Sequence, residues 1–307
     1  MLSRRTVLLA PLAAAAFPAP VAPKKAPAAS GNGKMTLCIH QNTSRAAGYR
    51  KSLEGWARAG IKNVEITDVM LDEFLKTGDL AAARRVVTDL GLTPVSSAAV
   101  LPDFWLPNPG RAALLDTWKK RCEQFSSFGL THVYCPAVTT RKVTMDDYKA
   151  SPDLIREAGE IARQYRMTAM IEFTRNSTFL STLTTSLKLI REAAHPNVRP
   201  MLDCYHFWSG LGKFEDLDLL HPGELAHVHF QDVPDMPREL LDNTTRIIPG
   251  DGVSPLVRIL RKLSEKGYSG PLSVELFLPE FQQGDPYEVA RRIREKCEAV
   301  MHQARVM

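Results

Sequence analysis

The chain has 307 residues, of which 44% are hydrophobic and 24% charged, a composition typical of one or two globular domains. Its formal net charge is +5, but five basic residues lie in the first 34 positions, which contain no acidic residue. From residue 35 onward, 34 basic residues balance 34 acidic ones. Residues 35–307 therefore carry no excess of positive charge that would attract nucleic acid, and we expect no nucleic-acid partner.

The first 34 residues have the pattern of an export signal followed by an Ala/Pro-rich linker. Arg4 and Arg5 precede an apolar stretch at residues 7–17. Paired arginines in this position resemble the bacterial twin-arginine signal, and the apolar stretch is too short for a permanent membrane span. We therefore expect export by the twin-arginine route to the periplasm. A merely disordered tail is the alternative.

From residue 35 onward, strand-like runs alternate with helical patterns. The strand-like runs are residues 35–40, 63–67, 94–100, 132–136, 168–173, 199–204, 225–231 and 271–277. The helical patterns lie at about 45–59, 71–90, 110–128, 146–165, 178–194, 214–220, 255–266 and 286–305. This alternation predicts an α/β fold, a single-domain (β/α)8 TIM barrel over residues 35–307. A doubly wound open sheet is the alternative, but the first run lacks the glycine-rich turn expected after it.

Four consecutive strand-like runs in the second half each carry a metal-ligating residue near their end. These residues are Glu172, Asp203, His229 and Glu275, spaced by 31, 26 and 46 positions. The carboxyl ends of barrel strands meet on one rim, so the spacing predicts a site for one divalent metal ion. Mixed oxygen and nitrogen ligands favour Mn²⁺, Co²⁺ or Mg²⁺, with Zn²⁺ or Fe²⁺ as alternatives.

Residues next to these ligands are candidates for supporting roles. His227 and His229 share one face of a strand, and His229 is nearer its carboxyl end, so we assign His229 as the ligand and His227 as a partner behind it. Asp232 is a second candidate for such support, or caps a loop. Two long loops, 101–110 and 232–252, are expected to shape a pocket on the same rim.

Several of these residues fall in motifs that resemble the xylose isomerase-like barrel superfamily. The motifs are Glu172, D-C-Y-H at 203–206, H-V-H-F-Q-D at 227–232, R-I-I-P-G-D-G at 246–252 and V-E at 274–275. They look most like the sugar phosphate isomerase/epimerase branch, which includes ketose 3-epimerases and inosose dehydratases. The resemblance implies the same four metal ligands. It places the family's substrate-contacting histidine and arginine at His206 and Arg246.

The chemistry of the ligands points to an enolate reaction. A divalent ion that chelates a ketone oxygen and a neighbouring hydroxyl stabilises the enediolate formed after loss of the α-proton. Glu172 and Glu275 could then act as catalytic base and acid on opposite faces of the substrate. His206 could polarise the carbonyl, or protonate a departing hydroxyl.

We therefore predict a divalent-metal-dependent isomerase or epimerase that acts on a small carbohydrate, a non-phosphorylated keto-sugar. A metal-dependent lyase or dehydratase of a keto-sugar, keto-glycoside or inosose is the first alternative. A non-catalytic sugar-binding barrel is the second. The related DNA-repair endonucleases need more histidines than this chain offers.

The remaining candidates rest on position alone. His40 and Glu65 end the first two strand-like runs and are candidates for substrate binding. Trp105, in the loop 101–110, could stack on a sugar or could belong to the core. Homodimers or homotetramers are the oligomeric states that we consider.

Overall fold

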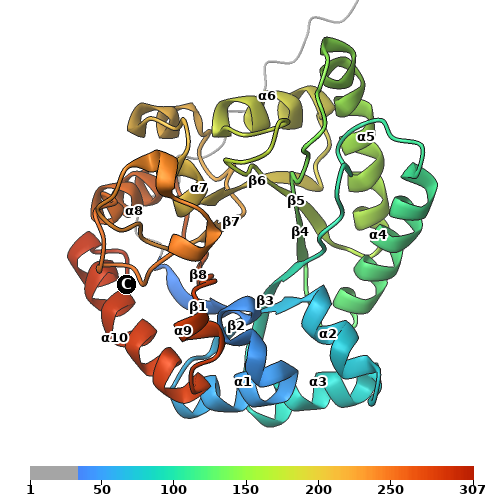
Figure 1. Cartoon of the computed structure of the whole chain (residues 1–307). Coiled ribbons are helices and arrows are strands. Elements are labelled where there is room, and N and C mark those ends of the chain that lie inside the picture. Colours follow the sequence, from blue (N-terminus) through green and yellow to red (C-terminus); the bar gives the residue numbers. More distant parts are fainter. Residues whose placement is uncertain (1–33) are drawn as a thin grey trace, which may run out of the picture.

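The computed structural model describes residues 34–307, so the predicted export signal, apart from residue 34, lies outside the described residues. Eight parallel strands form a closed barrel in the order β1 to β8 (Figure 1). They are β1 (Thr36–His40), β2 (Asn63–Thr67), β3 (Thr93–Ala98), β4 (His132–Pro136), β5 (Thr168–Glu172), β6 (Val198–Asp203), β7 (His227–His229) and β8 (Pro271–Val274). The barrel closes where β1 pairs with β8. The predicted TIM barrel is confirmed, and the open sheet is not.

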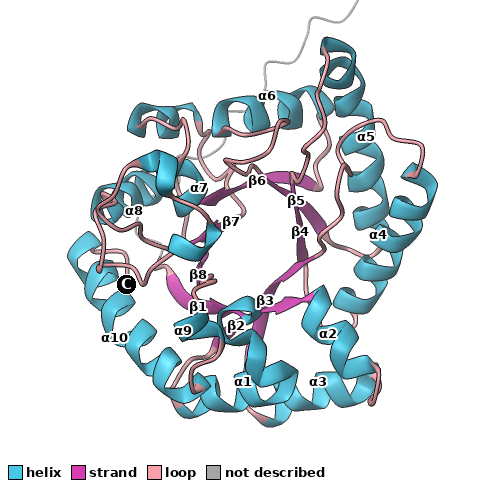
Figure 2. Ribbon diagram, viewed as in Figure 1, coloured by secondary structure: helices cyan, strands magenta, loops and turns pink. Residues whose placement is uncertain are grey.

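The helices form an outer layer around the strands (Figure 2). They are α1 (Gly48–Arg58), α2 (Asp68–Leu75), α3 (Leu80–Asp89), α4 (Arg111–Ser126), α5 (Met145–Gln164), α6 (Leu183–Ala193), α7 (Cys204–Ser209), α8 (Leu256–Glu265), α9 (Pro279–Gln282) and α10 (Pro286–Ala304). Short 3₁₀ turns are η1 (Gln41–Ala47), η2 (Phe214–Leu219), η3 (Arg238–Leu240) and η4 (Asn243–Thr245). Helix α8 shows the usual amphipathic design, with Leu256, Ile259, Leu260 and Leu263 buried.

The predicted helix over residues 71–90 is two helices in the structure. Helix α2 starts earlier than predicted, at Asp68, because Thr67 caps it by accepting a hydrogen bond from the Met70 amide. Helix α3 begins after Asp79, whose side chain accepts from the Ala82 amide. The break lies at residues 76–79, since Gly78 and the capping Asp79 favour a turn over a continuous helix.

Three of the four strands of the second half, β5, β7 and β8, are shorter than predicted, and β6 has the predicted length. Strand β7 spans three residues, and β8 ends at Val274, directly before Glu275. Strand β6 ends at Asp203, whose carboxylate accepts from the His206 amide at 2.7 Å and so caps α7. Asp203 therefore ends a strand and starts a helix at the same point.

Trp105 lies in the core, where it contacts aromatic neighbours instead of lining the pocket. It is 2% exposed, its ring packs against Phe104 and Trp118, and its indole N–H donates to the Cys135 carbonyl oxygen. This contradicts the expected substrate contact and supports the alternative of a core residue. An indole satisfies its one donor here by reaching a strand carbonyl, which fixes the loop 101–110 against the barrel.

Across residues 34–307, no helix combines the length and the apolar character that a membrane crossing requires.

Candidate metal centre

Glu172, Asp203, His229 and Glu275 come together at the carboxyl ends of β5 to β8. One ligand atom from each lies within 4.8 Å of the other three, and all four residues are buried. The His229 Nδ1 atom is 3.0 Å from Glu172 Oε1 and 3.5 Å from both Asp203 Oδ2 and Glu275 Oε2. The predicted ligand set is therefore a compact group of three carboxylates and one imidazole nitrogen.

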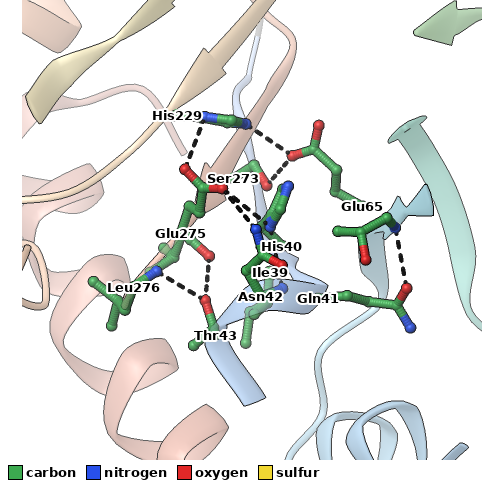
Figure 3. A network of polar contacts seen from close by, with 12 residues as sticks. Ile39, His40, Gln41, Asn42, Thr43, Glu65, His229, Ser273, Glu275 and Leu276 are labelled. Atoms are coloured by element: carbon green, nitrogen blue, oxygen red, sulfur yellow. Dashed lines mark hydrogen bonds and ion pairs between the residues drawn. The ribbon is translucent and has the colours of Figure 1, made fainter. Parts of the chain in front are cut away.

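The orientation of the His229 ring is set by Glu65, on β2. The other ring nitrogen, Nε2, points toward Glu65 (Figure 3). It lies 3.2 Å from Glu65 Oε2. A carboxylate can only accept, so Nε2 carries a proton, and Nδ1 is the nitrogen that faces the three acidic residues; its lone pair would be available to an ion once the Nδ1 proton is lost. Metal-binding histidines are commonly oriented by such a carboxylate.

The residues fit a divalent cation. Glu172 Oε1 and His229 Nδ1 are buried and lie 3.0 Å apart, and among the described residues neither has a hydrogen-bond partner outside the acidic cluster. Burial by itself lowers the pKa of His229, but the carboxylates of Glu65, Glu275 and Glu172 outweigh burial and raise that pKa well above its ordinary value. A field that attracts a proton so strongly also attracts a metal ion, and O/N ligands suit Mn²⁺, Co²⁺, Mg²⁺, Fe²⁺ or Zn²⁺.

Arg246 neutralises part of this acidic cluster. Its Nη1 atom donates to Asp203 Oδ2 and to Glu275 Oε2, both at 2.8 Å, and the residue is 2% exposed. Gln231 adds a bond from its amide nitrogen to Asp203 Oδ2 at 3.0 Å. The predicted substrate-contacting arginine therefore contacts two of the candidate metal ligands directly.

His206 faces the same cavity as a neutral imidazole. Burial is the main cause that lowers its pKa to about 4. The Arg175 amide points at Nδ1 at 3.3 Å, and Arg246 Nη2 lies 3.0 Å from Nε2. Two donors facing one ring oppose its protonation, so His206 is held as a hydrogen-bonding group and not as an acid.

Two residues predicted to bind substrate, Glu65 and His40, are completely buried and do not line the cavity. Glu65 lies behind the candidate ligands, where its Oε2 accepts from His229 and Ser273 (Figure 3) and also from His227. His40 lies between Glu275 Oε1, at 3.4 Å, and the Tyr134 hydroxyl, at 3.0 Å. Their positions suit the support of ligands, since parallel strands one and two bring them to the rear of the site.

The two predicted supporting residues, His227 and Asp232, differ in their contacts. His227 donates from Nε2 to Glu65 at 3.1 Å and so touches the residue that orients His229. Asp232 instead accepts from backbone amides of its own loop, those of Val233, Gly250, Gly252 and Ser254. It therefore acts as a loop anchor, which was the alternative expectation.

A cavity of about 310 Å³ opens above the ligands. Glu172, Glu275, His206 and Arg246 line it, with apolar and neutral polar side chains around them, namely Val100, Val138, Phe277, Thr139, Thr140, Thr174, Asn176 and Asn243. Arg246 is the only cationic side chain among the described residues that line the cavity. Its guanidinium group is already paired with the carboxylates of Asp203 and Glu275. The size suits a small polar molecule.

Sequence reasoning missed Tyr134, Gln231 and Asn42. Gln231 follows His229 by two positions, so the alternation of the strand could have placed it on the same face. Asn42 donates to Glu275 Oε1 at 3.2 Å from the turn after β1. Tyr134 lies on β4, whose sequence carries no charged residue at its end, and only the closed barrel brings it near His40.

A closed parallel barrel with three carboxylates and an imidazole on its carboxyl rim defines a TIM barrel with a candidate metal site. Residues 53–298 match the family model described as xylose isomerase-like TIM barrel, and the chain belongs to that family.

Its similarity to curated proteins extends over most of the barrel. An inosose isomerase of Halalkalibacterium halodurans is 28% identical over 254 residues, which cover 81% of this chain and 90% of that protein. A 3-dehydroshikimate dehydratase of Pseudomonas putida is 24% identical over 235 residues, 76% of this chain but 36% of that protein.

Solved structures share the fold. The IOLI protein, solved with a zinc atom, superposes with a TM-score of 0.82 at 24% identity, covering 88% of this chain and 99% of that one. An L-ribulose 3-epimerase gives a TM-score of 0.73 at 18% identity, with 88% and 96% covered.

Proposed function

We propose that the protein is a divalent-metal-dependent isomerase or epimerase of an uncharged keto-polyol, a non-phosphorylated keto-sugar or an inosose. The observation that carries this proposal is the presence of two buried glutamates, Glu172 and Glu275, which belong to the ligand cluster and also line the cavity. The inosose isomerases among its relatives support an isomerase.

The proposed reaction removes a proton from the carbon next to a ketone and returns it elsewhere. Glu172, Asp203, His229 and Glu275 would hold the ion, which when bound would stabilise negative charge developing on the substrate oxygens. Burial raises the pKa of Glu172 to about 7 in the metal-free site; a bound ion would lower it, so the carboxylate would exchange protons through an oxygen that the ion leaves free. Glu172 and Glu275 reach the cavity from β5 and from the end of β8, so one would remove the proton and the other return it.

The cavity favours a substrate without phosphate or carboxylate groups. Its single lining cation, Arg246, is already bonded to Asp203 and Glu275. Threonine and asparagine side chains offer hydrogen bonds to hydroxyl groups, while Val138 and Phe277 offer an apolar surface to carbon. A phosphate would need a free cation or a glycine-rich turn to balance its charge.

A metal-dependent dehydratase is the second candidate, because one relative is a 3-dehydroshikimate dehydratase. The two reactions share the proton abstraction and differ in whether a hydroxyl then leaves. Loss of hydroxide needs a proton donor, and His206 is held neutral with a pKa of about 4. We therefore place isomerisation first.

The test is solvent-deuterium exchange followed by NMR. Protein loaded with Mn²⁺, Co²⁺ or Mg²⁺ is incubated in D₂O with ketoses, keto-glycosides and inososes, and the ion is removed by a chelator where it would broaden the signals. We expect deuterium next to the carbonyl, lost with chelator present and in Glu275→Gln, but retained in Glu280→Gln, an exposed glutamate of α9. A new stereocentre without a C=C bond identifies the isomerase, and a new C=C bond the dehydratase.

Metal binding without exchange on any compound would contradict the proposed enzymatic activity and support a sugar-binding barrel.

From residues 1–34 alone, we also propose export by the twin-arginine route. Fractionation of cells that express the full chain and a variant with Arg4 and Arg5 replaced by lysine tests that proposal.

A further inference from the structure

Tyr134 lies at the floor of the cavity, beside the candidate metal ligands. Its ring packs with Ala98, Met170 and Met201 inside the barrel and meets the His229 ring almost at a right angle, with 5.1 Å between centroids. It lines the cavity together with Glu172 and Glu275. The proposed metal binding and proton transfer do not involve its hydroxyl group.

The hydrogen bonds of His40 determine which proton the Tyr134 hydroxyl can offer. The backbone N–H of Asn42 donates to His40 Nδ1 at 3.2 Å and caps the turn η1, closer than Glu275 Oε1, which lies 3.4 Å from the same nitrogen; a backbone amide can only donate. His40 Nδ1 therefore carries the lone pair, and Nε2 carries the proton. Nε2 lies 3.0 Å from the Tyr134 oxygen, so His40 donates and the tyrosine oxygen accepts.

This arrangement leaves the proton of Tyr134 without an acceptor in His40. A phenol is protonated at neutral pH and rotates its O–H toward an available acceptor. The hydrogen bond donated by His40 fixes the position of the Tyr134 oxygen. The O–H of Tyr134 is therefore held at the edge of the cavity and is free to donate. A donor fixed before the reaction stabilises charge at little cost in reorganisation.

We propose that Tyr134 is a catalytic hydrogen-bond donor to the substrate oxygen that gains negative charge when the α-proton leaves. This role rests on the proposed function. In the step, a glutamate carboxylate takes the proton, the C–H electron pair becomes the new C=C bond, and the carbonyl π pair moves onto oxygen. Tyr134 keeps its proton and strengthens its hydrogen bond to that oxygen.

The first experiment compares Tyr134→Phe with the wild type in deuterium exchange on an inosose. We expect the exchange rate at saturation to fall by about 100-fold, the size found when one donor to a developing oxyanion is removed. The KM for the inosose should change less than about threefold, because the bond is strongest in the transition state. The Kd for Mn²⁺, measured by calorimetry, should stay the same.

The matched control is Tyr49→Phe, which removes another buried tyrosine hydroxyl, one that donates to the Ala83 carbonyl away from the cavity. It should keep the wild-type exchange rate. A Tyr134→Phe protein that exchanges at the wild-type rate overturns the role of Tyr134 and leaves the proposed function intact. A wild type that exchanges nothing overturns both.

A second measurement keeps the hydroxyl and does not depend on the folding of the phenylalanine variant. With 3-fluorotyrosine at position 134, saturation with inosose should shift the ¹⁹F resonance of the metal-loaded protein. The same label at position 49 should not respond. No shift at position 134 overturns the contact, as does a Tyr134→Phe variant whose Mn²⁺ affinity falls together with its rate.

Discussion

Glu65 illustrates how a buried acid can orient a candidate metal ligand. It accepts hydrogen bonds from two histidines and from Ser273, all on Oε2, and His229 must present Nδ1 to the cluster as a result. A carboxylate in this position also makes the imidazole a better ligand. Glu65, in the middle of β2, therefore contributes by orienting His229.

Replacing Glu65 by glutamine should weaken divalent binding by about 10- to 100-fold, because the amide cannot hold both histidines in the required tautomers. Calorimetric titration of Mn²⁺ into the metal-free protein measures the change. The control is Glu73→Gln, which alters an exposed pair with Lys76 on α2. Equal affinities for the Glu65 variant and the wild type would show that His229 is oriented by packing alone.

The raised pKa of Glu172 predicts that the affinity for a metal ion depends on pH. Burial raises its pKa to about 7, so in the metal-free protein the carboxyl group is largely protonated below that pH and ionised above it. A metal ion must displace this proton, which by itself should lower the affinity by up to about tenfold per pH unit below pH 7. Calorimetry at pH 6 in two buffers of different ionisation enthalpy should detect release of about two protons, one from Glu172 and one from His229, whose pKa the carboxylates raise. Affinity that is flat between pH 6 and 8 would contradict the assignment.

At the scale of elements, the segment after β7 carries Arg246 into the site. Asp232 holds this segment by accepting four backbone N–H groups, and Gly252 passes so close to the Val233 carbonyl that a Cβ atom would collide with it. An antiparallel bridge between Asp232 and Ile247 adds to the restraint. The anchor therefore fixes Arg246 indirectly, through the fold of its loop.

Asp232→Ala should destabilise the protein by about 2–4 kcal/mol, since it leaves several buried backbone donors without their acceptor. Urea unfolding of the metal-free protein measures this loss. Asp235→Ala, an exposed position of the same loop, is the matched control and should stay within about 0.5 kcal/mol of the wild type. If both variants unfold alike, Asp232 does not anchor the loop.

The whole barrel buries an excess of negative charge at its carboxyl rim. Glu65, Glu172, Asp203 and Glu275 are all buried there, with Arg246 as the guanidinium that contacts two of them. Buried charges are tolerated only when they are paired, so a bound cation should stabilise the fold as well as serve the reaction.

Removing the ion with a chelator should therefore lower the melting temperature. An ion present at 100 times its Kd contributes about 2.7 kcal/mol, which for a chain of this size is on the order of 5 °C. Scanning calorimetry with chelator, then with Mn²⁺ restored, tests this. The Asp203→Asn variant should respond less to Mn²⁺, and an equal response from it would place the stabilising ion elsewhere.

The sequence by itself determined the architecture and indicated which candidate ligands meet on one rim. Alternating strand-like and helical runs predict a barrel because each run can be recognised from neighbouring residues in the sequence. The geometry of the barrel then brings the carboxyl ends of the strands to one rim. Glu172, Asp203, His229 and Glu275 could be named for the same reason, since each lies at the end of its own strand. The break between α2 and α3 was missed because capping at Asp79 competes with an otherwise helical pattern.

Only the tertiary structure decided how the other residues serve the site. Whether Glu65 and His40 face a substrate or support a ligand depends on which side chains lie across the barrel, and these come from strands far away in sequence. The same holds for Trp105, whose indole reaches a strand carbonyl, and for the contact of Tyr134 with His40, 94 positions away. Strand periodicity fixes which face a side chain occupies, but closure of the barrel fixes its neighbours.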